Sequence, residues 1–417
     1  MTKKLQPKLR FRGFTDAWEQ RKFSSIFGFL KTNSYSRASL QPCSTGIVDI
    51  HYGDILVNYD CCFSIDTHTL PTLKDPSLAD VYRNDLLMDG DIVIADTAED
   101  QTAGKCVELF DVGNRKVLAG LHTIAVRGRI KFGTGYLGYY LSSPAYRKQL
   151  LPQMQGTKVI SISKTALTNT VIASPCLAEQ TAIGALLRKL DVLIAAEKRK
   201  LNLLRTKKSG LMQEIFSQKV RFKGYQKEWK RYRMKDISYI ERGASPRPIS
   251  KYTTTDKSGL NWVKIGDAPS LGNVITSTSE RIKPKGLPKT RSVHPGDLIL
   301  SNSMSFGRPY IMGIDGCIHD GWLLIRTNRS KVNPSFLCQA LGSQFMISQY
   351  RRLAAGSAVN NLNKSIVGNA VIMIPSLKEQ NAIEKLLSCY DKLIAAENQK
   401  VNILVDQKKA LLERMLA

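Results

Sequence analysis

Two stretches of the chain place apolar residues three and four positions apart over about 40 residues, the spacing of a helix with one apolar stripe. The second stretch follows the first by 200 positions. This spacing predicts two long helices, over 174–218 and 374–417, that pack antiparallel as a coiled coil. A change of register is expected near Glu197 and Glu397. In the first stretch the stripe is formed by Ile183, Leu186, Leu190, Leu193, Leu201, Leu204, Leu211 and Ile215.

The similarity between the two halves extends beyond the helices. Residues 156–216 align with 356–416 without a gap, and residues 8–18 align with 219–229 at a different offset. A unit used twice in one chain indicates one architecture used twice, with a pseudo-two-fold relation. The segment 219–229 follows the first long helix, whereas 8–18 has no helix before it. The pattern therefore predicts a circular arrangement in which residues 1–20 lie near the end of the second helix.

The segments between the repeated parts, 21–173 and 219–373, share a pattern of elements but little identity. Gly-Asp turns lead into apolar strands at 90–96 and 296–302, and second strands are expected at 122–127 and 322–326. An amphipathic helix should follow near 136–154 and 336–353. The expected fold class is α+β, with two similar α/β domains separated by two long antiparallel helices. Ser376 and Glu379 have the spacing of a capping box at the start of the second helix.

The charge of the chain changes the picture from fold to partner. It carries 61 Lys and Arg against 35 Asp and Glu, a net charge of +26. This excess favours a polyanion such as nucleic acid, and the alternative is a solvated basic surface. No apolar run approaches the ~20 residues of a membrane span. The N-terminal basic residues precede no apolar core, and the eight cysteines form no CxxC pair. We therefore expect a cytoplasmic protein without disulfides, a metal site or a membrane partner.

Catalytic motifs are absent from the sequence. It contains neither a phosphate-binding GxxxxGK[ST] loop nor a GxSxG nucleophile elbow. Residues 333–336 (NPSF) approach the methyltransferase loop [DNS]PP[YF] but lack the second proline, and we interpret them as a helix cap. Acidic residues over 96–100, with Lys105 behind them, loosely imitate a metal-dependent nuclease. A self-contained methyltransferase or nuclease therefore stays open as an alternative, beside a stand-alone architectural or regulatory DNA binder.

Polar, basic and aromatic residues gather in the loops between the predicted elements. Arg suits guanine edges, Asn and Gln suit adenine edges, and Lys and hydroxyl groups more often hold phosphates. For any one residue the alternative is a solvated loop side chain. The candidates for DNA contact are Arg37, His51, Tyr52, Asn58, Tyr59, Thr97, Lys105, Thr157, Lys158 and Lys164 in the first half, and Arg242, Ser245, Arg247, Lys264, Asn302, Ser303, Arg308, Arg352, Ser357, Asn360, Asn361 and Lys364 in the second.

Taken together, these motifs resemble the specificity (S) subunits of type I restriction–modification enzymes over nearly the whole chain. The resemblance rests on the helix openings 175–183 (PCLAEQTAI) and 375–383 (PSLKEQNAI), on 262–267 (WVKIGD), and on the Gly-Asp strand entries. One proline precedes each helix opening where the family often has two. The Gly-x-Ser/Thr-Pro loop of the family is present at 243–246 (GASP), and the region 31–40 lacks it.

The resemblance implies a function that is not catalytic in this chain. Each of two target-recognition domains would read one half of a split DNA sequence, and the long helices would act as a ruler. The helices would also dock two modification subunits that methylate adenine N6 with S-adenosylmethionine. Restriction subunits would add ATP- and Mg-dependent cleavage, so no cofactor is expected on this chain. The residues expected to face these partners are Leu186, Leu190, Leu193, Leu204, Leu386, Leu393 and Leu404.

Overall fold

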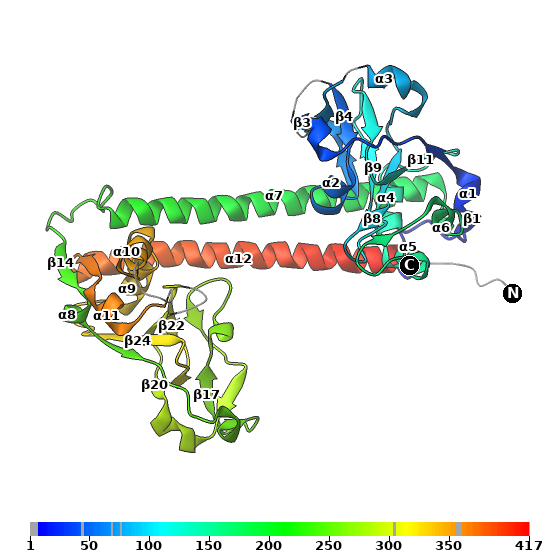
Figure 1. Cartoon of the computed structure of the whole chain (residues 1–417). Helices are drawn as coiled ribbons and strands as arrows, with labels where there is room; N and C mark the ends of the chain where they lie inside the picture. Colours follow the sequence, from blue (N-terminus) through cyan, green and yellow to red (C-terminus); the bar gives the residue numbers. More distant parts are fainter. Residues whose placement is uncertain are drawn as a thin grey trace. The chain divides into compact units, whose positions relative to one another are not determined.

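The computed structural model describes residues 7–42, 46–67, 70–75, 77–302, 306–354 and 361–416. The chain forms two compact units (Figure 1). Unit 1 comprises 1–196 and 401–417, and unit 2 comprises 197–400. Each long helix therefore begins in one unit and ends in the other.

Unit 1 contains a five-stranded sheet of order β2-β11-β7-β9-β5 and a four-stranded sheet of order β10-β4-β6-β3. Two further strand pairs, β1-β13 and β12-β8, are antiparallel. The strands are β1 (Glu19–Lys22), β2 (Phe27–Leu30), β3 (Leu40–Pro42), β4 (Ile47–Ile50), β5 (Cys62–Ser64), β6 (Pro71–Leu73), β7 (Ile92–Ala95), β8 (Thr97–Ala98), β9 (Cys106–Phe110), β10 (Val117–Ala119), β11 (Thr123–Gly128), β12 (Ile160–Ser161) and β13 (Val171–Ser174).

Unit 2 repeats this plan with two five-stranded sheets, of order β15-β24-β21-β22-β18 and β16-β19-β17-β23-β20. The pair β14-β25 corresponds to β1-β13. The strands are β14 (Lys230–Arg233), β15 (Ser238–Arg242), β16 (Thr253–Thr254), β17 (Leu260–Val263), β18 (Val274–Ile275), β19 (Glu280–Ile282), β20 (Arg291–Val293), β21 (Leu298–Ser301), β22 (Pro309–Met312), β23 (Gly316–Ile318), β24 (Trp322–Thr327) and β25 (Val371–Ile374).

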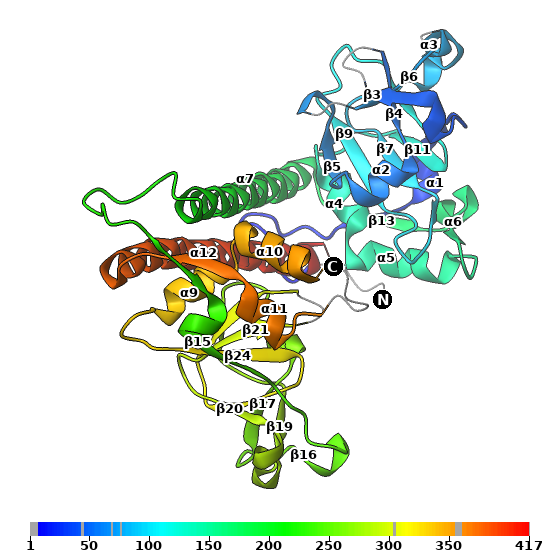
Figure 2. The same cartoon turned by 60° about the vertical axis from the view of Figure 1, so that its left-hand side comes forward.

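The strands β7 of unit 1 and β21 of unit 2 each lie at the centre of a five-stranded sheet and are buried on both faces. Helices cover one face of this sheet, and the second sheet of the unit covers the other. In unit 2, Leu298 and Leu300 face a core shared with the helices, while Ile299 faces a core shared with the second sheet. In unit 1, Ile92 and Ile94 likewise face the core shared with the helices, and Val93 faces the core shared with the second sheet. The rotated view shows this layering in unit 2 (Figure 2). The continuous apolar runs after the Gly-Asp turns thus form the predicted strands, and each fully buried side chain contributes about 1.5–3 kcal/mol.

Short helices and the two long helices complete the units. The predicted helices near 136–154 and 336–353 are each broken in two, which corrects the expectation of a single helix. In unit 1 the side chain of Ser143 caps a new helix that begins with Pro144. The helices are α1 (Phe23–Ile26), α2 (Tyr52–Val57), α3 (Leu78–Val81), α4 (Tyr136–Ser142), α5 (Pro144–Leu150), α6 (Lys164–Thr168), α7 (Leu177–Phe216), α8 (Met234–Ile237), α9 (Pro334–Leu341), α10 (Gln344–Ala354), α11 (Lys364–Asn369) and α12 (Leu377–Met415).

One backbone hydrogen bond demonstrates the circular arrangement. In unit 2, Val220 donates its N–H to the carbonyl of Glu214 at the end of α7, 3.2 Å away. In unit 1, the matching Leu9 donates to Arg414 at the end of α12, 3.0 Å away. The contact between neighbours in one unit is thus a contact between the two ends of the chain in the other, as the repeat predicts.

Within each unit the segments of α7 and α12 run antiparallel and are joined by ion pairs. In unit 2 the Lys200 ammonium lies 2.6 Å from Glu397, and the Lys208 ammonium lies 2.6 Å from Asp391. As the residue number rises on α7 it falls on α12. In unit 1, Lys408 lies 2.5 Å from Asp191, the matching pair with the helices exchanged. The repeat therefore preserves both partners of each pair.

Two side chains of the helix openings join the long helices to the sheets. Glu379 accepts hydrogen bonds from Arg221 at 2.8 and 3.0 Å and from the Trp229 indole at 3.2 Å. Gln380 accepts from the Asn333 N–H at 2.8 Å. Ser376 does cap α12, at 3.4 Å from the Glu379 N–H, but the Glu379 carboxylate is used by Arg221. The prediction that the Glu379 side chain returns a hydrogen bond to the backbone of Ser376 is therefore wrong.

Candidate nucleic-acid interface

The two units carry the same backbone frame at the place where their polar loops meet. In unit 1 the strands β4, β7 and β10 end there and β11 begins, and in unit 2 β17, β21 and β23 end there and β24 begins. Three backbone hydrogen bonds recur at matching places, each from an N–H to a carbonyl. In unit 1 they run from Gly120 to Ile50 at 3.0 Å, from Asp96 to His122 at 3.0 Å and from Ile162 to Asp96 at 2.8 Å. In unit 2 they run from His319 to Val263 at 3.1 Å, from Asn302 to Gly321 at 3.0 Å and from Leu362 to Asn302 at 2.9 Å.

Different side chains occupy this shared frame. These bonds place His51 of unit 1 where unit 2 has Lys264, and Asp96 where unit 2 has Asn302. The two units thus carry unlike side chains on one common backbone frame. This is the arrangement that the repeated strands and the unlike loops predict.

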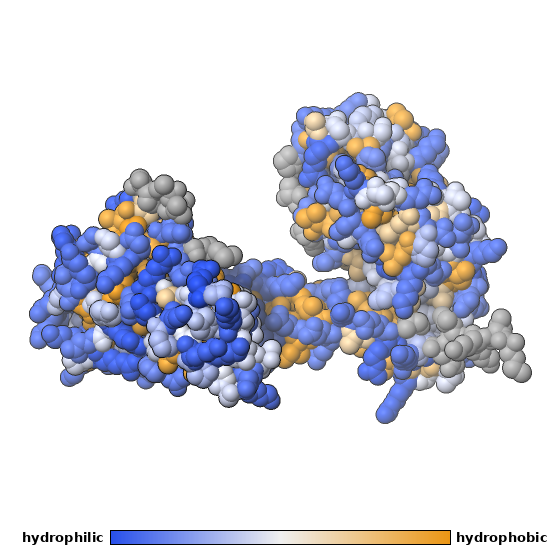
Figure 3. Space-filling view, turned by 60° about the horizontal axis from the view of Figure 1, so that its bottom comes forward, coloured by the Kyte–Doolittle hydropathy of each residue, from blue (hydrophilic) through white to orange (hydrophobic). Residues whose placement is uncertain are grey.

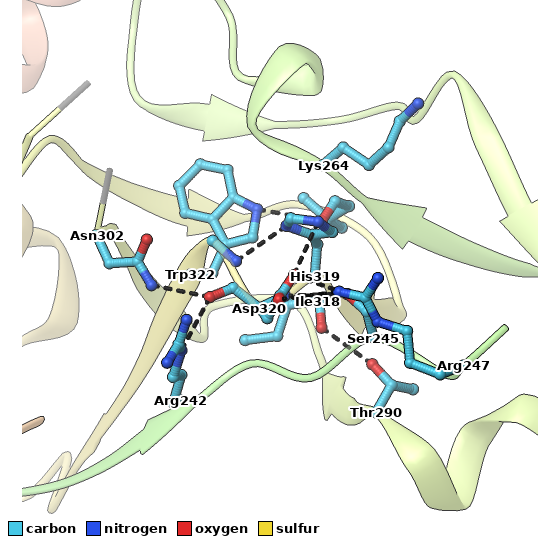
Figure 4. Close-up of polar contacts among 12 residues, drawn as sticks. Arg242, Ser245, Arg247, Lys264, Thr290, Asn302, Ile318, His319, Asp320 and Trp322 are labelled. Atoms are coloured by element: carbon cyan, nitrogen blue, oxygen red, sulfur yellow. Dashed lines mark hydrogen bonds and ion pairs between the residues drawn. The ribbon is translucent and has the colours of Figure 1, made fainter. Parts of the chain in front are cut away.

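In unit 2, four of the predicted contact residues surround the turn that carries Asp320 (Figure 4). Arg242 and Asn302 donate to the main-chain carbonyl of Asp320, at 3.2 and 2.8 Å. Ser245 donates its hydroxyl to the carboxylate at 2.8 Å, and the Arg247 guanidinium lies 3.7 Å from the other carboxylate oxygen. Asp320 was not singled out from the sequence, because a lone Asp after a short strand resembles any turn residue.

The loop 242–247 follows the edge of this turn closely. The Gly243 N–H donates to the carbonyl of Trp322 at 2.8 Å. A Cβ on Gly243 would lie 2.1 Å from the carbonyl oxygen of His319, so a larger residue would push the loop away from the turn. The Gly-x-Ser-Pro pattern therefore has a physical reason here: the glycine permits the close approach, and the serine then reaches Asp320.

The electrostatics of the turn favour an ionised aspartate beside a neutral imidazole. Burial raises the pKa of Asp320, but the hydrogen bond from Ser245 and the positive charge of Arg247 act in the opposite direction, and its pKa is lowered overall. Burial also lowers the pKa of His319, which favours the neutral ring. Unit 2 thus offers a carboxylate acceptor next to guanidinium donors.

Two other predicted cations of unit 2 already have protein contacts. The Lys264 ammonium lies 2.5 Å from a carboxylate oxygen of Glu280. Arg308 is exposed, and its guanidinium lies 5.2 Å from the centre of the Tyr310 ring. Asn302 is buried and supports the Asp320 turn, so the structure gives its side chain a positioning role in place of the predicted contact.

In unit 1 the equivalent frame position is occupied by a cluster around Asp96. The Thr97 hydroxyl donates to Asp96 at 2.8 Å, and His122 Nδ1 lies 3.5 Å from the same oxygen. The Tyr52 ring packs edge-on against His122, with ring centres 5.3 Å apart. His122 was not among the predicted contacts, although its backbone φ of 53° marks an unusual turn residue.

A second group in unit 1 is centred on the buried Asp54. Arg37 forms an ion pair with its carboxylate, and Asn58 donates to it at 2.9 Å. His51 caps α2 by accepting from the Gly53 N–H at 3.2 Å, and burial lowers its pKa. Tyr59 stacks on Phe63 with ring centres 4.0 Å apart. The side chains of His51 and Tyr59 are thus buried and make their contacts within the protein.

The buried Asp49 lies beneath this group. It accepts a hydrogen bond of 2.6 Å from Asn33, and burial raises its pKa to about 6. This carboxyl group has no exposed surface, so its role is to hold the first loop and not to touch a ligand.

The remaining predicted residues divide by exposure. Lys105 donates to the carbonyl of Leu56 at 3.0 Å. Lys164 lies over the Phe29 ring at 5.4 Å, and Lys364 lies over the Tyr239 ring at 5.5 Å. The exposed ones are Thr157, Lys158, Lys164, Arg352, Asn361 and Lys364. Ser303, Ser357 and Asn360 lie outside the described residues.

The segments that resembled catalytic motifs in the sequence have structural roles. Asn333 accepts from the N–H groups of Ser335 and Phe336, with Pro334 in the first turn, so the NPSF segment is a helix cap as predicted. Asp100 caps its own loop by accepting from Thr102 at 2.8 Å. Within the described ranges, no three His, Cys, Asp or Glu side chains are grouped as a metal would need. In the same ranges no helix is long and apolar enough to cross a membrane.

Part of the predicted partner-facing stripe is turned outward on the long helices. Leu193 and Leu393 are 40% and 50% exposed, while the neighbouring Ile194 and Ile394 are buried in the helix pair. The expectation that Leu193 belongs to the coiled-coil seam is therefore wrong, because the register shifts by one position there. Leu186, Leu190, Leu204, Leu386 and Leu404 are half-buried. Apolar surface is visible along the helices (Figure 3).

Part of the chain is similar to known specificity proteins of type I restriction systems. Residues 226–405 match the family model of the type I restriction modification DNA specificity domain. A Methanocaldococcus jannaschii protein provisionally named type I restriction enzyme MjaX specificity subunit is 24% identical over 369 residues, which is 84% of this chain and 83% of the relative. The type I restriction enzyme MjaVIII specificity subunit of the same organism is 25% identical over 285 residues, 64% of this chain and 66% of the relative.

A solved structure agrees over nearly the full length. The S subunit of a type I restriction-modification system from M. genitalium superposes with a TM-score of 0.61 at 12% identity, covering 99% of each chain. At this identity the likeness concerns the fold. The predicted fold class is thereby confirmed. The matching family model and relatives confirm the resemblance to type I specificity subunits.

Proposed function

We propose that this chain is a type I restriction–modification specificity subunit and that it reads the two halves of a bipartite and asymmetric DNA target, one half with each unit. One observation carries the proposal: equivalent frame positions in the two units hold unlike side chains. Unit 2 places an arginine-rich loop and Asp320 there, whereas unit 1 places Asp96, His122 and Tyr52.

The charge of the chain supports DNA as the ligand. With a net charge of +26, the protein attracts the phosphate backbone without regard to sequence. Exposed lysines such as Lys158, Lys164 and Lys364 are suited to phosphates, which fix position and carry no sequence information. Each phosphate contact adds about −0.9 to the slope of log affinity against log salt. Affinity for random DNA should therefore fall steeply with salt.

The long helices provide the surface for protein partners. Assembly with the other subunits of the restriction–modification system follows from the family. We further assign the outward leucines of α7 and α12, including Leu193 and Leu393, to contacts with two modification subunits. The pseudo-two-fold repeat supports two equivalent partners, because matching residues recur 200 positions apart.

Catalysis belongs to those partners in this proposal. The modification subunits would bind S-adenosylmethionine and methylate adenine, and restriction subunits would use ATP and Mg. This chain would contribute sequence reading and the scaffold, as expected for a specificity subunit, which is not itself an enzyme.

Mapping of methylated adenines in a host that carries this chain with its methyltransferase partners tests the proposal. We expect two short defined sequences separated by a gap of unspecified bases. Replacing residues 230–373 with the matching segment of a relative should change one half of the motif and leave the other. A continuous or palindromic motif would contradict the proposal.

The alternatives give different results in the same material. Methylation or cleavage of DNA by the purified chain alone, with S-adenosylmethionine or Mg²⁺, would indicate a self-contained enzyme. Purification from cells without a stoichiometric methyltransferase would indicate a stand-alone architectural protein.

A further inference from the structure

The turn that carries Asp320 is held by its own backbone. The Trp322 N–H donates to the carbonyl of His319 at 3.1 Å, which makes Asp320 and Gly321 the two central residues of a tight turn. The main-chain carbonyl of Asp320 accepts from Asn302 at 2.8 Å and from Arg242 at 3.2 Å. The carboxylate is therefore presented from a fixed backbone.

The imidazole of His319 fixes the direction of that carboxylate. Its Nδ1 accepts the N–H of Gly321 at 2.9 Å, so in the neutral ring the proton lies on Nε2. Nε2 lies 2.8 Å from Asp320 Oδ1, the same oxygen that accepts from Ser245. Oδ1 thus has two donors, whereas within the described part of the chain Oδ2 faces only the distant guanidinium of Arg247, 3.7 Å away.

This ion pair differs from the structural ion pairs of the same unit. Arg326 and Arg221 meet Asp297 and Glu379 at 2.7 and 2.8 Å, and those carboxylates are 9% and 2% exposed. In contrast, the side chain of Asp320 is 32% exposed and that of Arg247 is 76% exposed. A loose, open pair contributes little to stability, so stability gives no reason for its presence.

The position of Asp320 also runs against simple attraction of phosphate. Arg242, Arg247 and Lys264 make the surroundings cationic, and a carboxylate among them repels the DNA backbone. A carboxylate does, however, accept a hydrogen bond from the amino group of a base. In the major groove a carboxylate suits cytosine N4, and an arginine suits guanine O6 and N7.

We propose that Asp320 and Arg247 together read one G·C base pair in the half-site of unit 2, with Asp320 accepting from cytosine N4 and Arg247 donating to the guanine. His319, Ser245 and Asn302 act as positioning residues that hold the turn. The frame of unit 1 has Leu121 where unit 2 has Asp320, so this reading element belongs to unit 2 alone. The inference rests on the proposed function and specifies the chemistry of one of its two sites.

Selection from a randomised double-stranded DNA library tests the inference, with the chain assembled with its modification subunits. Wild type should select a G·C pair at one position of the unit 2 half-site. Asp320→Asn and Arg247→Lys should each reduce that preference by about ten- to a hundredfold and leave the unit 1 half-site unchanged. The loss should be specific to that position, because phosphate contacts do not distinguish bases.

Asp315→Asn is the matched control. Asp315 lies in unit 2, is 75% exposed and pairs with His294 at 2.7 Å, so the control removes the same charge outside the cluster. It should leave the selected sequence unchanged. The same result with Asp320→Asn would assign Asp320 an electrostatic or structural role and overturn the inference.

Each remaining outcome also supports or overturns the inference. If Asp320→Asn does not fold, the test rests on Arg247→Lys, which changes an exposed side chain. An unchanged preference for the G·C pair in that variant overturns the inference. If wild type selects two half-sites but neither variant changes a G·C position, the proposed function stands and this inference fails. If wild type selects no bipartite sequence, both fail.

Discussion

The carboxylate of Glu379 should be the point at which the opening segment 219–229 is fastened to α12. Its side chain is 2% exposed and accepts three hydrogen bonds, two from Arg221 and one from Trp229. The Arg221 pKa is raised, chiefly by its hydrogen bond to Glu379. Glu379→Gln keeps the shape of the side chain but removes the charge and places an amide N–H₂ against donors.

The expected cost follows from these contacts. Breaking a buried ion pair typically costs about 3–5 kcal/mol, because one partner stays buried and unpaired. Arg221 is 22% exposed and can turn partly toward water, so we expect about 3 kcal/mol. Since 1.4 kcal/mol is a factor of ten, backbone amides that exchange by local opening of this segment should exchange about a hundredfold faster.

Hydrogen exchange read by mass spectrometry resolves this effect by segment. Glu379→Gln should increase exchange in 219–229 and leave 8–18 unchanged. The matched variant Glu179→Gln should do the reverse, because Glu179 holds Arg10 at 2.6 and 2.8 Å in unit 1. Equal protection in wild type and Glu379→Gln would refute the reasoning, and so would loss of protection throughout unit 2.

Three further predictions concern the helix pair, a buried acid and the chain ends. Lys208→Asp should lower the free energy of unfolding, measured in urea, by about 1–3 kcal/mol, since the Lys208–Asp391 pair is partly buried. Adding Asp391→Lys to this variant should restore much of the loss, whereas Asp391→Lys alone should not stabilise the protein. Asp49→Asn should stabilise the protein at pH 8 by up to about 3 kcal/mol, because burial raises the pKa of the Asp49 carboxyl from 3.8 to about 6. The gain in stability should vanish as the pH falls from 6 to 4, where the native carboxyl is already protonated. A gain that stays constant with pH would argue against burial as the cause. A chain joined from its C-terminus to its N-terminus by a short linker and opened between Gln218 and Lys219 should fold with wild-type circular dichroism and DNA binding, because Leu9 and Arg414 are hydrogen-bonded; a failure to fold would contradict the equivalence of the two connections.

The sequence predicted the framework well because the framework is repeated and periodic. Strands after the Gly-Asp turns and the two long helices follow directly from apolar spacing. The breaks at Ser143 and Ser343 escaped it, because the apolar spacing continues across each break. The register of the helix pair also escaped it: Leu193 and Ile194 are both apolar, and only the packing of the partner helix turns Ile194 inward.

The candidate site was predicted in part. Loop composition identified Arg242, Ser245 and Arg247, whereas Asp320 carries no signal in the sequence and is recognised only by the side chains that converge on it. Conversely, Tyr59 has the composition of a base-stacking residue but packs on Phe63 in the core. Residue type alone does not separate a surface aromatic from a buried one.

By itself, the sequence predicted that one architecture is used twice and that the chain closes on itself, and its net charge favoured a polyanionic partner, because repetition, apolar period and net charge are properties of the chain. Tertiary structure decided which residues meet. The antiparallel pairing brings Lys208 to 2.6 Å from Asp391 and Lys408 to 2.5 Å from Asp191, two ion pairs that the sequence did not indicate. Hydrogen bonds and ion pairs act over a few ångströms, and only the folded chain sets such distances between residues far apart in sequence.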